Sequence, residues 1–173
     1  MIEYKVYWTF IVSIISCFWV LLLFIRDLKK QVIERTNGTI NRFLESDKFL
    51  IENPEVQMFF IEHHRADPDE FREETWLTDK RFIRAKTHAY MVLNCFDELL
   101  SVSSSVKKRA IPFLMPNLIE QEDWEAYIRV KMSHPLFRCI LVHEAPIFGS
   151  TLVKFWKKEQ KTIESMTVDP FVW

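Results

Sequence analysis

The sequence predicts an all-α protein in which a single N-terminal transmembrane helix is followed by a cytoplasmic multi-helix bundle. Glycine is rare: the 173 residues include 2 glycines, although tight β-hairpins rely on glycine for positive φ angles. Long stretches are rich in leucine, lysine, glutamate, arginine and methionine, which favour helices. A continuous apolar run near the N-terminus completes the prediction, because its length suits a bilayer.

Composition also limits the classes of function. Charged residues make up 27% of the chain and hydrophobic residues 49%, so the part after the apolar run is neither disordered nor wholly embedded in a membrane. The formal net charge is −1, whereas nucleic-acid binders usually present a strongly basic face. We therefore expect no nucleic-acid partner.

The apolar run extends from Val6 to Ile25 without a charged residue. A helix of this length spans about 30 Å, the thickness of the hydrocarbon core of a bilayer. A cleavable signal peptide has a shorter apolar run and a small-x-small site before the charges, which this sequence lacks. A lipoprotein signal ending at Cys17 would turn polar after the cysteine, but the apolar run continues. We interpret the run as a membrane anchor.

Basic residues gather after this run, which predicts the orientation of the chain. Only Lys5 precedes it, beside Glu3. The basic residues that follow are Arg26, Lys29, Lys30 and Arg35. The positive-inside bias then places the N-terminus outside and the body in the cytoplasm, with the span in the cell inner membrane. The three cysteines, Cys17, Cys95 and Cys139, suit a reducing compartment.

Small and hydroxyl residues mark one side of the predicted span. They follow the spacing i, i+4, i+7 and i+11 and are Thr9, Ser13, Ser16 and Val20. Such residues let helix backbones approach closely in lipid, so this face is a candidate packing surface for another transmembrane helix, from a second copy or from a host complex. Alternatively, each hydroxyl satisfies the carbonyl four residues earlier in its own helix. Both interpretations stay open.

Beyond the span, the sequence divides into three parts. Residues 1–37 form the anchor and a juxtamembrane helix, 38–163 a helical domain, and 164–173 a C-terminal tail. The first boundary is a predicted helix break at Asn37-Gly38, since Asn-Gly is a common turn dipeptide. Three later helices are expected to begin at proline, with Pro at the first helical position. Their expected cap residues are Asn53, Asp67, and Ser133 or His134.

The clearest helical pattern covers Asp79 to Val102. Its apolar positions are spaced alternately by three and four, which predicts one buried stripe facing a helix that carries Trp124 and Tyr127. The stripe comprises Phe82, Ala85, Ala89, Val92, Phe96 and Leu99. Asn94 or Asp97 on this helix is expected to cap a neighbouring helix or to join a polar network. Residues 101–118 are expected to form a loop with a short helical piece, and further helices are expected over 119–133 and 147–164.

The common catalytic motifs are missing from the sequence. It has no glycine-rich phosphate loop, no CxxC pair, no Glu-x-x-His and no G-x-S-x-G. We therefore expect no enzyme activity, cofactor or metal. His63 and His64, with Asp67 and Asp69 nearby, could bind a metal, but adjacent helical residues point about 100° apart, which favours a solvated helix end.

Two further sets of residues are candidate contact sites. One set is basic and is either a solvated face or a surface for anionic lipid headgroups or a nucleotide-like ligand. It comprises Lys107, Lys108, Arg109, Lys154, Lys157 and Lys158. The other set is the apolar end of the tail, where Phe171 and Trp173 are expected to dock on the domain or on a partner.

Three segments together carry a resemblance to other proteins. They are "ENPEVQMFF", "HAYMVLNCFDEL" and "EDWEAYIRVKMSHPLFRCIL". With the single N-terminal span, they resemble a scattered group of uncharacterised bacterial membrane-anchored helical proteins, over Asn53 to Phe155. The resemblance implies a helical fold and a single-pass topology, and it assigns no activity.

These observations favour a membrane-tethered helical module for protein–protein interaction or regulation, one form of which is an accessory subunit of a membrane assembly. Its expected partners are the lipid bilayer and another transmembrane helix. An oligomeric membrane effector of the stress or antiphage type, with a ligand-sensing cytoplasmic domain, is the alternative. An enzyme with an unrecognised site is the third hypothesis.

Overall fold

The computed structural model describes residues 2–108 and 121–167 of the chain. Within these residues the secondary structure is entirely helical, as predicted. The α-helices are α1 (Ile2–Glu52), α2 (Pro54–Glu62), α3 (Lys80–Lys108), α4 (Gln121–Met132), α5 (Pro135–His143) and α6 (Ser150–Ser165). The short 3-10 helices are η1 (Pro68–Arg72), η2 (Glu74–Thr78) and η3 (Ala145–Ile147).

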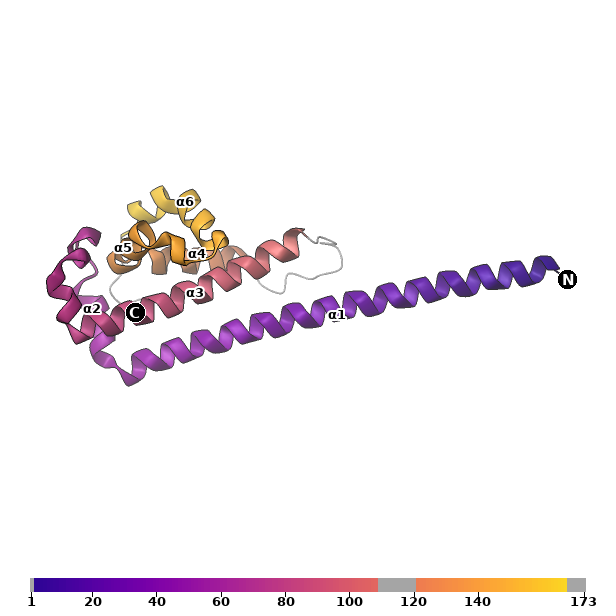
Figure 1. Cartoon of the computed structure of the whole chain (residues 1–173), viewed down its shortest axis with the longest axis horizontal. Coiled ribbons are helices and arrows are strands. Elements are labelled where there is room, and N and C mark those ends of the chain that lie inside the picture. The colour runs from indigo at the N-terminus through magenta and orange to yellow at the C-terminus, as the bar shows by residue number, and fades with distance from the viewer. Residues whose placement is uncertain (1, 109–120, 168–173) are drawn as a thin grey trace.

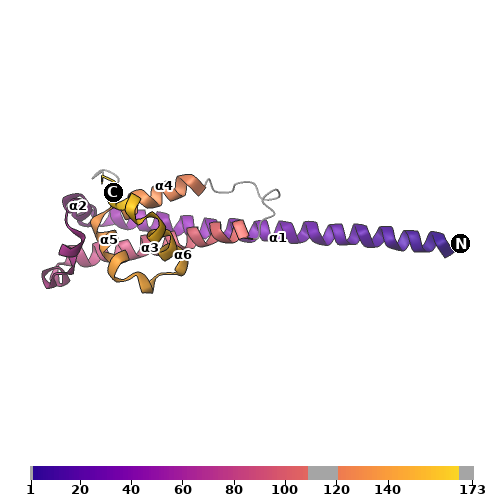
Figure 2. The ribbon, with the colours of Figure 1, turned by 90° about the horizontal axis from the view of Figure 1, so that it is seen from above.

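Helix α1 dominates the shape of the molecule. Its 51 residues correspond to a length of about 76 Å. The N-terminal half projects away from the other helices, and the C-terminal half lies along α3 (Figures 1 and 2). Helices α2, α5, α6 and η2 pack on α3, and α4 packs on α5 and α6. Helix α1 therefore joins an exposed apolar segment to a helical body in one continuous element.

The predicted break at Asn37-Gly38 was wrong, because α1 runs through both residues. Both are exposed, and a β-carbon built on Gly38 would meet no atom within 4 Å. Thr36 and Thr39, on either side of them, are buried. A glycine inside a helix costs about 1 kcal/mol relative to alanine, and burial of the flanking threonines, with the bond from Thr39 to Glu98 of α3, outweighs that cost.

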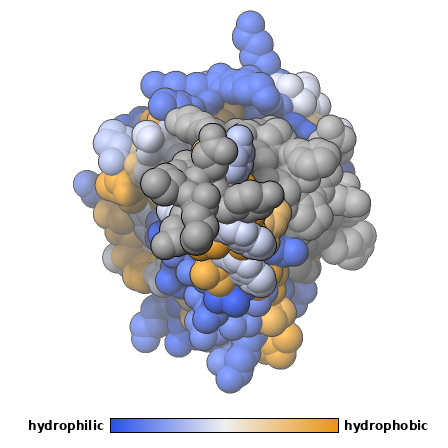
Figure 3. Space-filling model, turned by 90° about the vertical axis from the view of Figure 1, so that its right-hand side faces the viewer, coloured by the Kyte–Doolittle hydropathy of each residue, from blue (hydrophilic) through white to orange (hydrophobic). Residues whose placement is uncertain are grey.

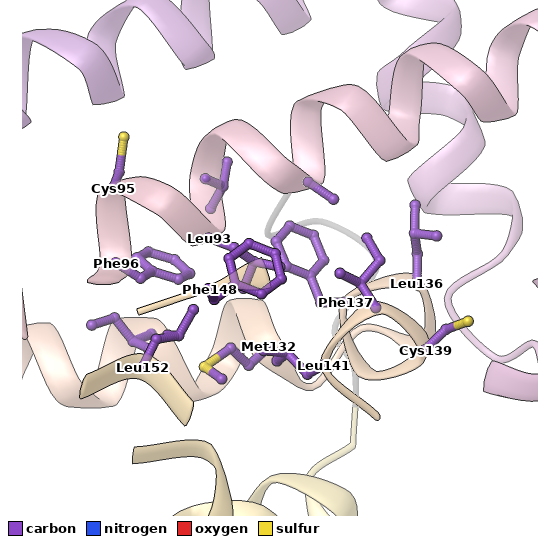
Figure 4. Packing of buried hydrophobic residues seen from close by; sticks show 14 of the residues in the cluster. Leu93, Cys95, Phe96, Met132, Leu136, Phe137, Cys139, Leu141, Phe148 and Leu152 are labelled. Atoms are coloured by element: carbon purple, nitrogen blue, oxygen red, sulfur yellow. The ribbon is translucent and has the colours of Figure 1, made fainter. Parts of the chain in front are cut away.

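Helix α3 is the central element of the core. Every residue of its predicted apolar stripe is buried. The ring of Phe96 lies 5.4 Å from that of Phe43 on α1 and 6.2 Å from that of Tyr127 on α4. The stripe therefore packs against α4, as predicted, and also against α1. Figure 4 shows Phe96 and Leu93 of α3 beside Met132, Phe137 and Leu152 of α4, α5 and α6.

The predicted loop after α3 begins later than expected. The helix was predicted to end at Val102 but extends to Lys108, so the prediction of a loop was wrong for residues 103–108. The segment from Ser101 to Lys108 contains neither glycine nor proline, and the first proline comes at position 112. Two terminal lysines also suit the negative end of a helix macrodipole.

Proline marks the helix starts, as predicted, with different capping at each. His134 caps α5, and its Nδ1 accepts the Leu136 N–H at 3.1 Å. Asp67 forms a capping box with Glu70, although the helix that follows is η1 and not an α-helix. Asn53 precedes α2 but makes no side-chain cap; its Nδ2 donates to the Phe49 carbonyl at 2.8 Å.

Asp97 of α3 caps α6, one of the two roles expected for it. Its Oδ1 accepts the Leu152 N–H at 2.9 Å, in the first turn of α6. A β-carbon on Gly149, the residue before α6, would lie 2.7 Å from Asp97 Cγ and closer still to Oδ2. Gly149 has φ −64° and ψ 155°, which any residue adopts, so glycine is needed here for space.

Candidate functional site

The projecting half of α1 is the most distinctive surface of the molecule. Its large apolar side chains from Tyr7 to Phe24 are all exposed, Trp8 by 65% and Phe24 by 59%. Soluble monomers rarely expose a contiguous apolar surface of this size. By length and composition α1 is able to cross a membrane, and none of its most apolar window is buried inside the protein.

The predicted packing face lies on this exposed rod. Ser13 donates its hydroxyl hydrogen to the Thr9 carbonyl at 2.8 Å, which is the intrahelical bond of the second interpretation. Val20 is exposed, as are Thr9 and Ser16. A hydroxyl bonded within its own helix still allows close approach of a second helix, so the packing prediction stands untested.

On the C-terminal side of its exposed apolar segment, α1 contacts α3 through polar side chains. Glu98 of α3 forms an ion pair with Arg42 and accepts a hydrogen bond from Thr39 Oγ1 at 3.2 Å. The hydroxyl oxygen of Thr39 (Oγ1) also lies 3.0 Å from the carbonyl oxygen of Arg35. These contacts fix the register of the two helices at the point where α1 joins the core.

The same part of α1 shows an apolar stripe that the sequence analysis did not single out. Ile40, Leu44 and Ile51 are spaced by four and seven residues, so they share one side of the helix. Ile51 is 79% exposed and Leu44 60%, while Phe43 and Leu50 beside them are buried. The spacing alone could have identified this stripe, but periodicity does not separate a core face from a second, exposed one.

A buried polar cluster joins α1, α3 and α4. Nδ1 of His88 lies 3.2 Å from Ser46 Oγ. Burial and, to a smaller extent, the charge of Lys131 together lower the pKa of His88 to about 4. Burial also lowers the pKa of Lys131 to about 8, against the opposing effect of Asp47. His88 is therefore neutral near pH 7, and its hydrogen bond with Ser46 is a structural contact.

His134, at the start of α5, is fully buried, and both of its ring nitrogens form hydrogen bonds. Its Nδ1 caps the helix, and its Nε2–H donates to the Phe60 carbonyl at 3.0 Å. Burial lowers the pKa of His134 to about 3, although the bond to Phe60 favours the charged form. With both ring nitrogens occupied, His134 is a structural residue and holds α2 against α5.

A second polar cluster lies at the end of α5. Lys86 Nζ donates to Glu144 Oε1 at 2.7 Å, and the Tyr90 hydroxyl donates to Glu144 Oε2. Burial opposes ionisation of Glu144, but the two hydrogen bonds outweigh it and keep the pKa of this carboxyl below its usual value. Burial and the bond to Glu144 raise the pKa of Tyr90. The cluster ties α3 to the C-terminal end of α5.

The structure does not bring the histidines and aspartates of the metal hypothesis together. The ring of His63 lies against that of Phe59, with centroids 4.5 Å apart, and His64 Nδ1 lies 2.7 Å from the Ile61 carbonyl oxygen. Asp69 instead contacts His143 Nε2 at 3.1 Å. Among residues 2–108 and 121–167, no group of three or more His, Cys, Asp or Glu side chains is placed to hold a metal ion.

The predicted basic set is split between two helices. Lys107 and Lys108 end α3, whereas Lys154 and Lys157 are exposed on α6. Lys158 pairs with Glu159 at 2.9 Å. Arg109, and the tail residues Phe171 and Trp173, lie outside the described residues.

Comparison of the chain with protein-family models, with curated proteins and with solved structures finds no match. The functional argument therefore depends on the surfaces described above.

Proposed function

We propose that this protein is a single-pass, membrane-tethered helical module for interaction or regulation, with its body on the cytoplasmic side of the cell inner membrane. One observation carries the proposal: α1 is a single helix that begins as a fully exposed apolar rod and continues into the packed interface with α3. The rod has the length of a bilayer core. The basic residues follow it directly, as the positive-inside bias requires of a cytoplasmic body.

The exposed stripe of Ile40, Leu44 and Ile51 supports an interaction role for the body. It lies on the same rigid helix as the rod, below the predicted membrane surface. A partner that packs on this stripe as a helix, and also on the Thr9–Val20 face, would run parallel to α1. Such a partner is a membrane-anchored helix of a host assembly or a second copy of this chain.

The experiment is purification of the full chain from membranes in mild detergent, with the mass of the intact complex measured. A serine variant of the stripe (Ile40→Ser, Leu44→Ser, Ile51→Ser) is expected to reduce the mass to that of the single chain. The matched control replaces three exposed apolar residues away from α1 (Leu77→Ser, Val142→Ser, Ile147→Ser) and is expected to keep the complex.

The outcomes separate the hypotheses. Release of the chain from membranes by alkaline carbonate would reject the anchor. A mass equal to that of the single chain in the unaltered protein would reject the interaction role. A homo-oligomer that is toxic to the host when triggered would favour the alternative, an oligomeric membrane effector.

A further inference from the structure

We infer that α1 pairs with α1 of a second copy of this chain, as a parallel two-stranded coiled coil that includes the exposed apolar stripe of the body. The pairing rests on the membrane-tethered module proposed above and names its partner. We call the line of contact within the body the seam; it comprises Ile33, Asn37, Ile40, Leu44, Asp47 and Ile51.

The buried face of α1 already follows a seven-residue repeat. From position 36 onward its buried residues are spaced alternately by three and four; they are Thr36, Thr39, Phe43, Ser46 and Leu50. A repeat of 3.5 residues falls slightly short of a helical turn, so a helix that keeps it along a neighbour winds left-handedly around that neighbour. The face of α1 that meets the body is therefore patterned as a strand of a coiled coil.

A second face of α1 follows the same repeat and stays exposed. Residues seven apart along the whole helix are exposed, namely Thr9, Ser16, Leu23, Lys30, Asn37, Leu44 and Ile51. In a straight helix Ile51 would be rotated by about 120° from Thr9, at about 20° per heptad. Winding at the seven-residue repeat removes this rotation. One partner helix can then follow both the predicted packing face of the apolar run and the stripe of the body.

Exposure alone does not single out this face. Apolar side chains reach the surface of the molecule at several places among hydrophilic ones (Figure 3). Leu77 and Ile147, in the short 3-10 helices η2 and η3, are as exposed as Leu44. The seam differs from them because it extends for about 27 Å along one α-helix, which is enough for a helix to pack against it.

The proposed anchor fixes how two copies meet. Two chains anchored in one membrane have the same orientation, so their α1 helices run parallel with the ends of their apolar runs at equal depth. Equal depth leaves no stagger, and each seam residue then faces the same residue of the second copy. Such a two-fold contact is self-complementary, and Ile40, Leu44 and Ile51 fulfil it as apolar pairs.

Asn37 suits a contact with a second copy better than one with an unrelated helix. It is exposed in the interior of α1, where asparagine is a poor helix former. Its amide carries both donors and an acceptor, so two copies of Asn37 can bond to each other across the two-fold axis. A single asparagine at this heptad position, among apolar residues, specifies two strands in register.

Charges at the seam also pair between identical copies. Lys29 and Glu34 are five residues apart, the spacing at which the flanking residues of two parallel strands form ion pairs. Asp47 lies in the seam, and Lys48 of the second copy lies next to it. Glu34 and Lys48 each have an exposed ion pair within their own helix, at 3.8 and 3.6 Å. Exposed pairs contribute little, so exchanging them costs little.

Disulfide formation tests the seam, because it reports which residues of two chains are adjacent. For helix axes about 9.5 Å apart, the Cα atoms of a seam residue and its copy are about 6 Å apart, and those of the next residue along about 13 Å. A disulfide requires about 4.4–6.8 Å. The seam variants are Leu44→Cys and Ile51→Cys. The matched controls are Glu45→Cys and Glu52→Cys, which are equally exposed positions outside the seam.

Every variant is made in the full chain with Cys17→Ser, because Cys17 is exposed, whereas Cys95 and Cys139 are buried. Membranes that contain the chain are oxidised with copper phenanthroline, and the fraction at twice the chain mass is measured on a non-reducing gel. We expect both seam variants to crosslink at least about five-fold more than their controls, given the distance limit for a disulfide. Equal crosslinking of seam variants and controls would overturn the inference, as would no crosslinking in both seam variants.

Three measurements separate this result from the proposed function and from folding. A purified complex heavier than the single chain, without crosslinking in either seam variant, would reject the second copy and keep the interaction module, with a host helix on the stripe. A single-chain mass would reject both, and release by alkaline carbonate would reject the anchor. The substituted side chains lie on the surface, so we expect each variant to melt within a few degrees of the Cys17→Ser chain by circular dichroism.

Discussion

The contact between Gly149 and Asp97 predicts a substitution whose effect changes sign with its background. In Gly149→Ala, the new β-carbon would lie 2.7 Å from Asp97 Cγ, so the carboxylate must rotate away. Rotation breaks its bond to the Leu152 N–H, now 2.9 Å. Loss of an N-terminal cap costs about 0.5–2 kcal/mol, and crowding adds to this cost.

Alanine also has a favourable effect at this position. It reduces the freedom of the unfolded chain, which stabilises the folded state by about 0.4–1 kcal/mol where the backbone angles are compatible, as they are at Gly149. The net expectation for Gly149→Ala is a loss of about 1–2 kcal/mol. In an Asp97→Ala background the space is free and the cap is already lost, so Gly149→Ala should then stabilise by about 0.4–1 kcal/mol.

The assay is equilibrium urea unfolding of the full chain in mild detergent, followed by tryptophan fluorescence, since Trp156 of α6 is buried. Gly38→Ala is the control. It has no neighbour within 4 Å and lies inside α1, so it should stabilise by roughly 0.5–1 kcal/mol in either background. A loss of the same size for Gly149→Ala with and without Asp97 would refute the reasoning.

Three further predictions concern acid stability, the core and topology. The pKa values of His88 and His134 are lowered from 6.5 to about 4 and about 3, so acid favours the unfolded chain, which binds protons at these histidines first. Their contribution to stability is complete above pH 6.5, and unfolding at several pH values should show a loss of up to about 2 kcal/mol per histidine between pH 6.5 and 5. A flat stability profile over this range would contradict the prediction. Phe96→Ala should lower the free energy of unfolding by about 3–5 kcal/mol, because Phe96 is fully buried; a loss below about 1 kcal/mol would mean that its site collapses on truncation. Cys139 is buried and is expected in the cytoplasm. A thiol reagent that does not cross membranes should therefore leave it unlabelled in intact cells, even after mild denaturation of proteins exposed at the cell surface. Labelling of Cys139 would reverse the proposed orientation.

Periodicity predicted the parts of the fold in which one face of a helix is buried. The α3 stripe is an example, because apolar residues at alternating three and four spacing have one physical solution in a helix. The prolines likewise predicted helix starts, since proline at the first helical position loses no hydrogen bond. Both features are local, and local rules are sufficient for them.

The sequence could not predict features that depend on tertiary contacts. Local rules predict a turn at Asn37-Gly38, but burial of Thr36 and Thr39 and the bond from Thr39 to Glu98 of α3 keep the helix intact. The exclusion of a β-carbon at Gly149 arises from Asp97, 52 residues earlier in the chain.

The continuity of α1 would couple the body mechanically to the membrane in the anchored chain that we propose. From Arg26 to Glu52 the helix extends about 40 Å below the apolar run, with no turn to absorb a change of direction. A transmembrane helix tilts by about 20° on average, and the tilt follows the thickness of the bilayer. For an anchored chain, a tilt of that size carries the far end of α1 sideways by about 14 Å. In the anchored chain that we propose, a change in bilayer thickness would thereby displace the far end of the body sideways.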